Sequence, residues 1–199
     1  MYGSARHFFC MISAKAFAYD IAVENADGIT IYYNYIHNGE ELEVTFCECS
    51  YNNTYAYYGT IVIPEEVIYN NTTRKVTSIG MYAFNKCRAL TSVDIPNSVT
   101  SIGECAFYNC WALTCITIGN GIKEISQYAF GAYPDLRDVY CYAEEVPQTD
   151  LYAFSYFDMY DALSKIVLHI PSSSVDKYKS VEPWKYLNSL TKQALRNHN

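Results

Sequence analysis

The sequence predicts a repeat solenoid, and three observations lead to that fold class. The segment from Val76 to Ala143 repeats one phrase three times at a spacing of 23 residues. Three apolar columns keep this spacing without gaps: Phe84, Phe107 and Phe130; Ala83, Ala106 and Ala129; and Leu90, Leu113 and Leu136. Each copy also ends in a strand-like alternation of apolar and polar residues. Self-similarity at a fixed period of this size indicates coils that bury their apolar sides against their neighbours.

The end of each copy is predicted to be a short strand. The spacing Leu90-x-x-Val93-x-Ile95 recurs one and two repeats later, and its last four residues alternate inward and outward as in a half-buried strand. Stacking these strands produces one parallel ribbon. Two outward columns are predicted: Val62, Asp94, Thr117, Tyr140 and Val167 in one, and Thr60, Ser92, Cys115, Asp138 and Lys165 in the other.

The rest of each copy is predicted to return the chain to the next strand. Val76 to Ile79 is expected to be a second short strand, and Pro96 ends the first ribbon strand where a backbone donor is dispensable. The apolar residues of Gly80 to Cys87 fall on one side of a single helical or 3₁₀ turn. Units therefore start near residues 76, 99, 122 and 146, and the last, looser unit is expected to spend three extra residues before Leu163.

The repeated phrase V-T-S-I-G-x-x-A-F-x-x-C-x-x-L-T-x-V-x-I-P-N-S resembles the BspA-type leucine-rich repeats of surface and secreted proteins in anaerobic gut and oral bacteria, which are also expanded in some parasitic protists. The resemblance extends from Gly59 to Leu190. Ordinary leucine-rich repeats carry a buried Asn three residues after the last strand leucine, whereas Ser98 and Gly121 stand there in this sequence. The resemblance implies a right-handed coil with short parallel β-ribbons and short helical turns. It also implies non-catalytic binding of proteins or host surfaces.

The solenoid is predicted to span residues 59–171, with a cap at each end because its end units would otherwise expose core and unpaired strand edges. Residues 19–58 are expected to form an N-terminal β cap. In that segment two alternating strand patterns, at 29–36 and 42–46, flank an Asn38-Gly39 turn, which predicts a hairpin.

Residues 172–199 are expected to form a C-terminal helical cap. The hydroxyls of Ser172 to Ser174 are predicted to cap a short helix that Pro183 ends. Trp184 is expected to fold over the last unit and to pack there rather than to bind a ligand.

Residues 1–18 have the pattern of a signal peptide. Arg6 precedes a short apolar run, and Ala16-Phe-Ala18 offers a small-x-small cleavage site; the alternative is an N-terminal strand or helix. We therefore expect a secreted or cell-surface protein, with bacterial export. A net charge of −7 without a Lys/Arg cluster argues against nucleic acid and anionic membranes as partners. No later apolar run approaches the length of a membrane span, and we expect a monomer.

Little in the sequence indicates chemistry. None of the eight cysteines forms a C-x-x-C pair, and no His stands at zinc-ligand spacing, so no metal site and no cofactor are predicted. Cys87 and Cys110 share a repeat phase and are expected to be neighbours in adjacent coils, either as buried thiols, which we favour, or as a disulfide. The pair of Cys141 and His169 leaves a cysteine hydrolase as one alternative function.

The main functional hypothesis is an exported protein-binding or adhesion module that uses the ribbon face. A carbohydrate-binding surface module is the second, and a coplanar row of exposed aromatic rings would favour it. Tyr140 has the large, pre-ordered area of an interface hot spot, and Tyr142 follows on the same side if alternation persists. The candidate binding face is Asp94, Thr117, Asp138, Tyr140 and Tyr142. No catalytic, cofactor-binding or metal-ligating residue is assigned.

Overall fold

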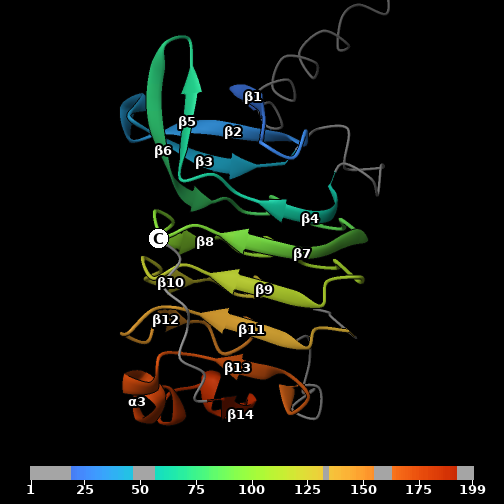
Figure 1. Cartoon of the computed structure of the whole chain (residues 1–199), viewed down its shortest axis with the longest axis vertical. Coiled ribbons are helices and arrows are strands. Elements are labelled where there is room, and N and C mark those ends of the chain that lie inside the picture. Colours follow the sequence, from blue (N-terminus) through green and yellow to red (C-terminus); the bar gives the residue numbers. More distant parts are fainter. Residues whose placement is uncertain (1–18, 47–56, 132–134, 155–162, 192–199) are drawn as a thin grey trace, which may run out of the picture.

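The computed structural model describes residues 19–46, 57–131, 135–154 and 163–191. Within these ranges the chain forms a stack of coils with a sheet on each of two sides (Figure 1). The solenoid predicted from the repeat is confirmed. The predicted signal peptide at residues 1–18 lies outside the described residues, as do parts of both predicted caps.

The predicted ribbon is a six-stranded, wholly parallel sheet, named the ribbon sheet below. Its order from the N-terminal end is β4 (Tyr58–Val62), β7 (Ala89–Ile95), β9 (Cys115–Ile118), β11 (Asp138–Cys141), β13 (Val167–His169) and β14 (Asn188–Thr191). Val93, Ile116 and Val139 pair in one row and are buried, as the repeat predicts. Figure 1 shows these strands lying one below another along the long axis.

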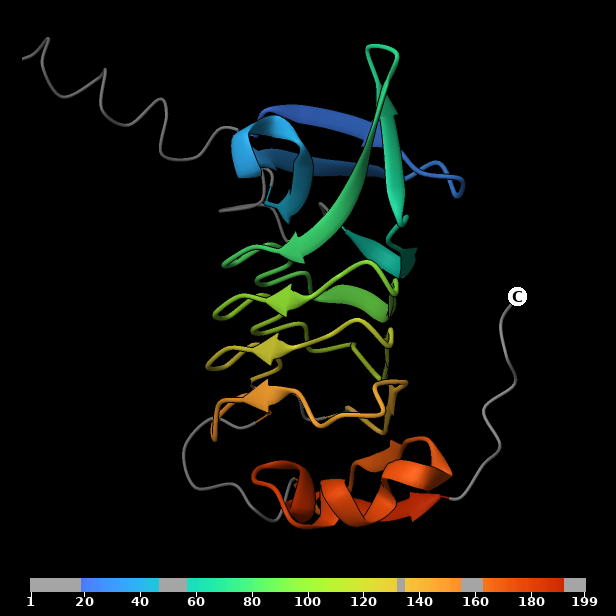
Figure 2. The same ribbon diagram turned by 90° about the vertical axis from the view of Figure 1, so that its left-hand side faces the viewer.

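The second sheet has eight strands and continues from the N-terminal cap into the coils. The strands are β1 (Ile21–Glu24), β2 (Thr30–Ile36), β3 (Glu41–Thr45), β5 (Glu66–Tyr69), β6 (Thr72–Ile79), β8 (Ser101–Ile102), β10 (Glu124–Ile125) and β12 (Gln148–Thr149). Strands β2 and β3 form the predicted antiparallel hairpin around η1 (His37–Gly39). Because β3 then pairs in parallel with β6, the cap extends the sheet of the first coil (Figure 2).

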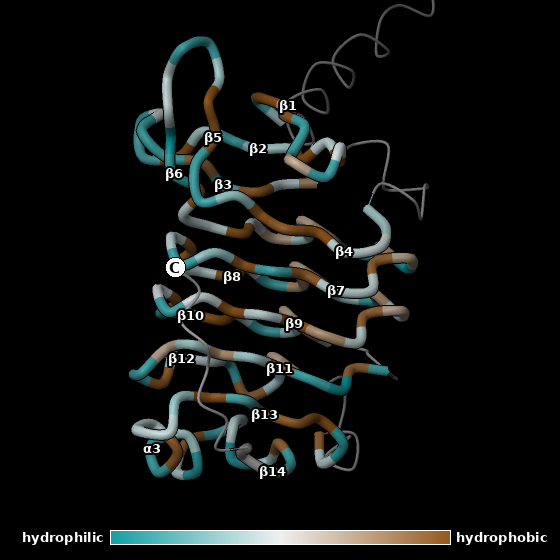
Figure 3. The backbone as a smooth tube through the Cα atoms, in the orientation of Figure 1, coloured by the Kyte–Doolittle hydropathy of each residue, from teal (hydrophilic) through white to brown (hydrophobic). Residues whose placement is uncertain are grey.

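A second hairpin, between β5 and β6, was not predicted. The strands pair antiparallel, and Asn70 and Asn71 turn between them with φ of 50° and 59°. Asn tolerates this left-handed conformation better than most residues, which suits a two-residue hairpin loop. The hairpin rises beyond the end of the coils, and its tip is hydrophilic (Figures 1 and 3).

The segment from Gly80 to Cys87 differs from the single helical or 3₁₀ turn that was expected. Tyr82 and Lys86 adopt positive φ, and the chain forms successive turns. The Ala83 N–H donates within the segment, to the Gly80 carbonyl at 3.3 Å, but the next amide, of Phe84, donates to Ala106 in the following coil at 2.7 Å. In a helix the later amides would all bond within the segment, whereas here alternate amides form a third ladder of hydrogen bonds between coils.

The core is a column of aromatic rings along the stack. Phe84, Phe107, Phe130 and Phe154 stack with centroid separations of 4.8, 5.4 and 5.4 Å. Rings with polar tips stand at both ends. Tyr57 lies 4.6 Å from Phe84 and is tilted by 50°, and Trp184 lies 5.0 Å from Phe154 at 69°. The Trp184 indole N–H donates to Thr149 Oγ1 at 3.0 Å, so its polar atom remains bonded although the side chain is buried.

The C-terminal segment contains more than the expected helix. After η3 (Ser172–Ser174), α3 (Val175–Lys179) and η4 (Trp184–Tyr186), the chain adds β14 to the ribbon sheet. The predicted hydroxyl cap is wrong, because neither helix start has a side-chain cap; Ser174 Oγ donates instead to the Glu144 carbonyl at 2.8 Å. The packing of Trp184 is confirmed, since it is 1% exposed. No helix in the described ranges is long and apolar enough to cross a membrane.

Candidate binding face on the ribbon sheet

The register of the ribbon sheet arranges its outward residues in two rows. The first row is Thr60, Ser92, Cys115, Asp138 and Val167, and the second is Val62, Asp94, Thr117, Tyr140 and His169. The second row therefore holds three of the predicted site residues, and Asp138 lies in the first row, two residues before Tyr140 on β11. Side chains in both rows stand outward because alternate residues of each strand, such as Val139 and Ile116, are buried.

The predicted C-terminal ends of both rows are wrong, whereas Thr60 and Val62 stand at the N-terminal ends as predicted. Val167, expected beside Tyr140, pairs with Asp138, and Lys165, expected beside Asp138, precedes the strand. The prediction counted alternation from Leu163, which is buried but lies before β13. A shift of two residues leaves the inward and outward pattern of a strand unchanged, so alternation cannot reveal it. Aligning Ile170-Pro171 with Ile95-Pro96 gives the correct register.

The corrected register brings His169 into the site, which the sequence analysis missed. The rings of Tyr140 and His169 stack with centroids 4.1 Å apart and an interplanar angle of 9°. His169 Nε2 lies 2.8 Å from Asp138 Oδ1, and the residue is 7% exposed. One face of the Tyr140 ring is thus covered, and its orientation is fixed by a neighbour that is itself held by a carboxylate.

Tyr142 continues the outward side of β11, as predicted. Its N–H donates to the Ile118 carbonyl at 3.0 Å, so the pairing with β9 continues past Cys141 and sets Tyr142 beside Gly119. Burial raises the pKa of the Tyr142 hydroxyl, and the charge of Asp94 raises it further.

Cys115 lies between the two carboxylates of the face. Burial raises the pKa of its thiol first, and then Asp138 and Asp94 do so. Burial followed by the charge of Asp138 likewise raises the pKa of Tyr140. The thiol and the phenol therefore stay protonated at neutral pH and can act only as neutral hydrogen-bonding or packing groups.

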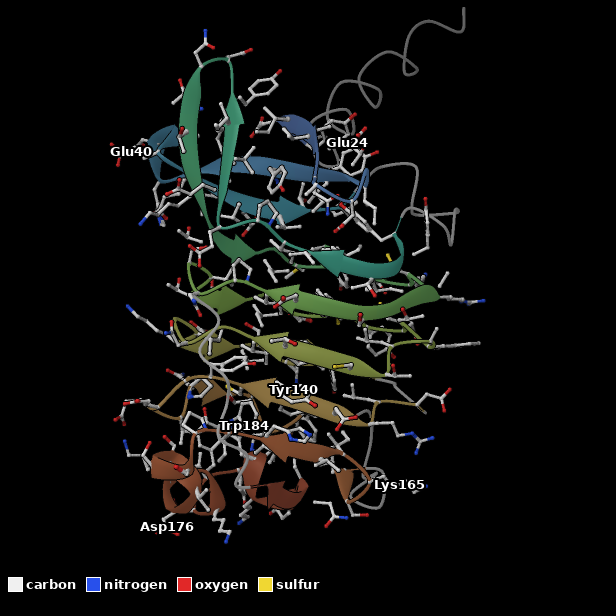
Figure 4. All side chains as sticks on the ribbon, viewed as in Figure 1. Glu24, Glu40, Tyr140, Lys165, Asp176 and Trp184 are labelled. Atoms are coloured by element: carbon white, nitrogen blue, oxygen red, sulfur yellow. The ribbon has the colours of Figure 1, made fainter. Side chains whose placement is uncertain are left out.

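The charges of the face have one sign. The six strands of the ribbon sheet contain no Lys or Arg; their acidic residues are Asp94 and Asp138. Figure 4 shows Tyr140 on the exposed side of β11, with Lys165 away from it at the end of the coil. An anionic surface around an aromatic ring repels acidic partners and attracts cationic ones.

Cys141 and His169, the pair considered for a cysteine hydrolase, do not form a catalytic site. Cys141 points into the core, where its Sγ lies 3.2 Å from Tyr178 Oη, whereas His169 is on the outward side with Asp138. Since the sheet separates them, His169 cannot act as base for that thiol. Cys87 and Cys110 are free, buried thiols, as we favoured. Among the described residues no cluster of three His, Cys, Asp or Glu side chains could hold a metal ion.

A second group of aromatic rings lies on the turn side of the coils. Tyr108 and Tyr128 are 6.4 Å apart and inclined by 58°, and Tyr128 and Tyr152 are 6.1 Å apart and inclined by 38°. These inclinations give no flat platform. In the ribbon sheet the parallel rings of Tyr140 and His169 cover each other. The coplanar row that would favour a glycan-binding surface is therefore not formed by either set.

Comparison with known proteins agrees with the architecture. The profile of the BspA type leucine rich repeat region matches residues 52–181 in six copies. A leucine-rich repeat protein from Bacteroides capillosus is 25% identical with a TM-score of 0.54, over 74% of this chain and 97% of that one. The leucine rich repeat protein of T. pallidum is 19% identical with a TM-score of 0.52, over 86% and 83%. A search of curated proteins gives no match.

Proposed function

Because the chain belongs to the BspA-type leucine-rich repeat family, we propose that it is a non-catalytic protein-binding module that recognises its partner with the outward face of the ribbon sheet. The observation that carries this proposal is the fixed stack of Tyr140 on His169. A large ring that is already ordered loses little conformational entropy on binding, and such residues dominate interface energies.

The backbone of the face supports the same function. The six strands of the ribbon sheet are joined by parallel pairing, and the inward residues of β9 and β11 are fully buried. A rigid surface of this kind loses little freedom when a partner docks on it. Solenoids bind through broad faces of this type because repetition makes them continuous.

We also propose that the protein is exported and acts at a cell or host surface. The pattern of residues 1–18 supports export, as does the resemblance of the repeat to surface and secreted proteins. A reporter enzyme fused after Ala18 tests this step. Export of the reporter is expected, and its retention in the cytoplasm would contradict the proposal.

The binding face is tested by capture from matrix and mucin extracts, with and without enzymatic removal of glycans. Tyr140→Ala is expected to weaken binding of a captured protein by about 1–3 kcal/mol. Tyr152→Ala is the matched control, because Tyr152 is a 39% exposed tyrosine on the turn side of the coil. Thr117→Arg should also block the face while leaving the Tyr140 stack in place.

Two results would redirect the proposal. If capture requires the glycans, the module binds carbohydrate. If both ribbon variants leave binding of a captured partner unchanged, but substitutions in the hairpin loop from His37 to Glu41 abolish it, the N-terminal cap is the recognition element.

A further inference from the structure

We propose that the partner is a basic protein segment, and that one of its arginine side chains docks over β9 against the ring of Tyr140. This inference rests on the proposed function, since it assigns a partner chemistry to the same face. Three properties of the strands around β9 support it.

The first is the difference in side-chain size between neighbouring strands. The outward residues of β9 are the small Cys115 and Thr117, followed by Gly119. On one side of β9 lie Tyr140, in β11, and Tyr142, just after β11. On the other side lies Asp94, in β7. Apart from Ser92, the outward side chains beside β9 are thus longer than its own, so a side chain from another molecule that lies over Thr117 would have longer side chains on both sides.

The second property is the orientation of Tyr140. Its stacking partner His169 is on β13, and the 4.1 Å between their centroids is close to the spacing of adjacent strands. The two rings therefore stack along the direction that runs from strand to strand. The opposite face of Tyr140 is turned toward Thr117 on β9. A guanidinium can stack on such a face, and its planar shape suits it better than an ammonium.

The third property is the charge. Asp94 pairs with Thr117 from β7 and Asp138 pairs with Cys115 from β11, so an acidic residue lies on each side of β9. Lys and Arg are absent from all six strands, and His169 approaches Asp138 from the β13 side, away from β9. A guanidinium over Thr117 would thus have an aromatic face and two carboxylates as neighbours. The net charge of −7 would speed the approach of a basic segment.

The experiment compares three peptides of equal length, rich in arginine, lysine or glutamate, by fluorescence anisotropy at physiological salt with the full chain. The arginine peptide is expected to bind tightest, and the glutamate peptide not to bind. The double variant Asp94→Asn with Asp138→Asn should lower the affinity for the arginine peptide by about tenfold or more. Thr117→Lys places a cation over β9 and keeps both carboxylates. It should lower the affinity for the arginine peptide by the same factor.

The matched control removes two charges elsewhere, with Glu24→Gln on β1 and Asp176→Asn on α3; both residues lie far from Tyr140 (Figure 4). This control should change the affinity by less than about twofold. Thermal unfolding of every variant checks that the fold is retained. Equal weakening by the ribbon and control variants would overturn the proposal, because binding would then follow net charge alone. So would equal affinities for arginine and glutamate peptides.

The two proposals can fail separately. If Tyr140→Ala abolishes binding of a captured partner but the Asp94→Asn, Asp138→Asn double variant leaves that binding unchanged, the ribbon face is the binding surface and the proposed cationic chemistry is wrong. If Tyr140→Ala, Thr117→Arg and the double variant all leave binding of the partner unchanged, the ribbon face is not the binding surface. Both proposals are then wrong.

Discussion

The regular coils and the last coil contribute different things to the molecule. In the regular coils paired residues are one repeat apart, as with Thr117 and Tyr140, and strands β7, β9 and β11 present their outward residues in step. The last coil carries an insertion, so Tyr140 pairs with His169 rather than with the residue one repeat later. Regular repetition builds the stack, whereas the departure from it places a histidine against Tyr140. Four predictions test this division of roles.

The largest effect is expected inside the regular stack. Phe107→Ala removes the middle ring of the column, where the side chain is fully buried between Phe84 and Phe130. The free energy of unfolding should fall by about 3–5 kcal/mol, measured by chemical denaturation. Tyr108→Ala, one residue outside the column, should cost much less. Similar small losses from both variants would show that the coils do not depend on the column.

A close approach between regular coils gives the second prediction. A Cβ on Gly121 would lie 1.9 Å from the carbonyl oxygen of Asn97 in the preceding coil, so Gly121→Ala must push the two backbones apart. We expect a loss of about 1–3 kcal/mol in the free energy of unfolding. Ser98→Ala is the control, since position 98 has the same repeat phase and already carries a Cβ. An unchanged melting temperature for Gly121→Ala would mean that the coils are less tightly fixed.

The third prediction concerns the last coil. His169→Ala removes the stack on Tyr140 and the bond to Asp138, and we expect a stability loss of about 1 kcal/mol. The loss of partner affinity should exceed that of Val62→Ala at the other end of the same row. If His169→Ala destabilises the protein as much as Phe107→Ala, the last coil is part of the core and not a variable surface.

The smallest effect is expected where the N-terminal cap meets the first coil. Thr77 Oγ1 donates to Glu41 Oε2 at 2.6 Å, and this bond, followed by one from His37, lowers the pKa of Glu41. A carboxylate whose pKa is lowered by folding stabilises the protein above the ordinary carboxylate range and loses that contribution as the pH falls through its folded-state pKa.

Glu41→Gln should therefore reduce stability at pH 7 by about 0.2–1 kcal/mol, because the group is near the surface, and should have no such effect at pH 2. Denaturation curves at the two pH values measure this difference. A larger loss at pH 2 than at pH 7 would contradict the assigned sign.

The sequence predicts what the repeat enforces and misses what departs from it. The rows through β7, β9 and β11 follow from a constant period, and the aromatic column follows from Phe84 and its equivalents. The hairpin of β2 and β3 follows from its Asn-Gly turn.

Two of the elements that were not predicted were missed for local reasons. The turns after Gly80 have the apolar spacing of a helical turn, and only the positive φ of Tyr82 and Lys86 distinguishes them. Strand β14 follows a helical segment and has no counterpart in the repeat. The position of His169 was missed because a two-residue slip preserves the alternation of inward and outward residues. The stack of Tyr140 on His169 depends on the length of the insertion before β13, which alternation does not reveal.

The orientation of Trp184 also limits how such a chain can evolve. Its ring meets Phe154 edge to face, and its nitrogen is bonded to Thr149, so it offers no parallel face for a further phenyl ring. A duplicated copy of residues 99–121, inserted between existing coils, would find on both sides the surfaces that its parent already matches. A copy appended after Trp184 would find none. Duplication of an interior coil can therefore lengthen this protein, whereas addition of a coil after Trp184 cannot continue the aromatic column.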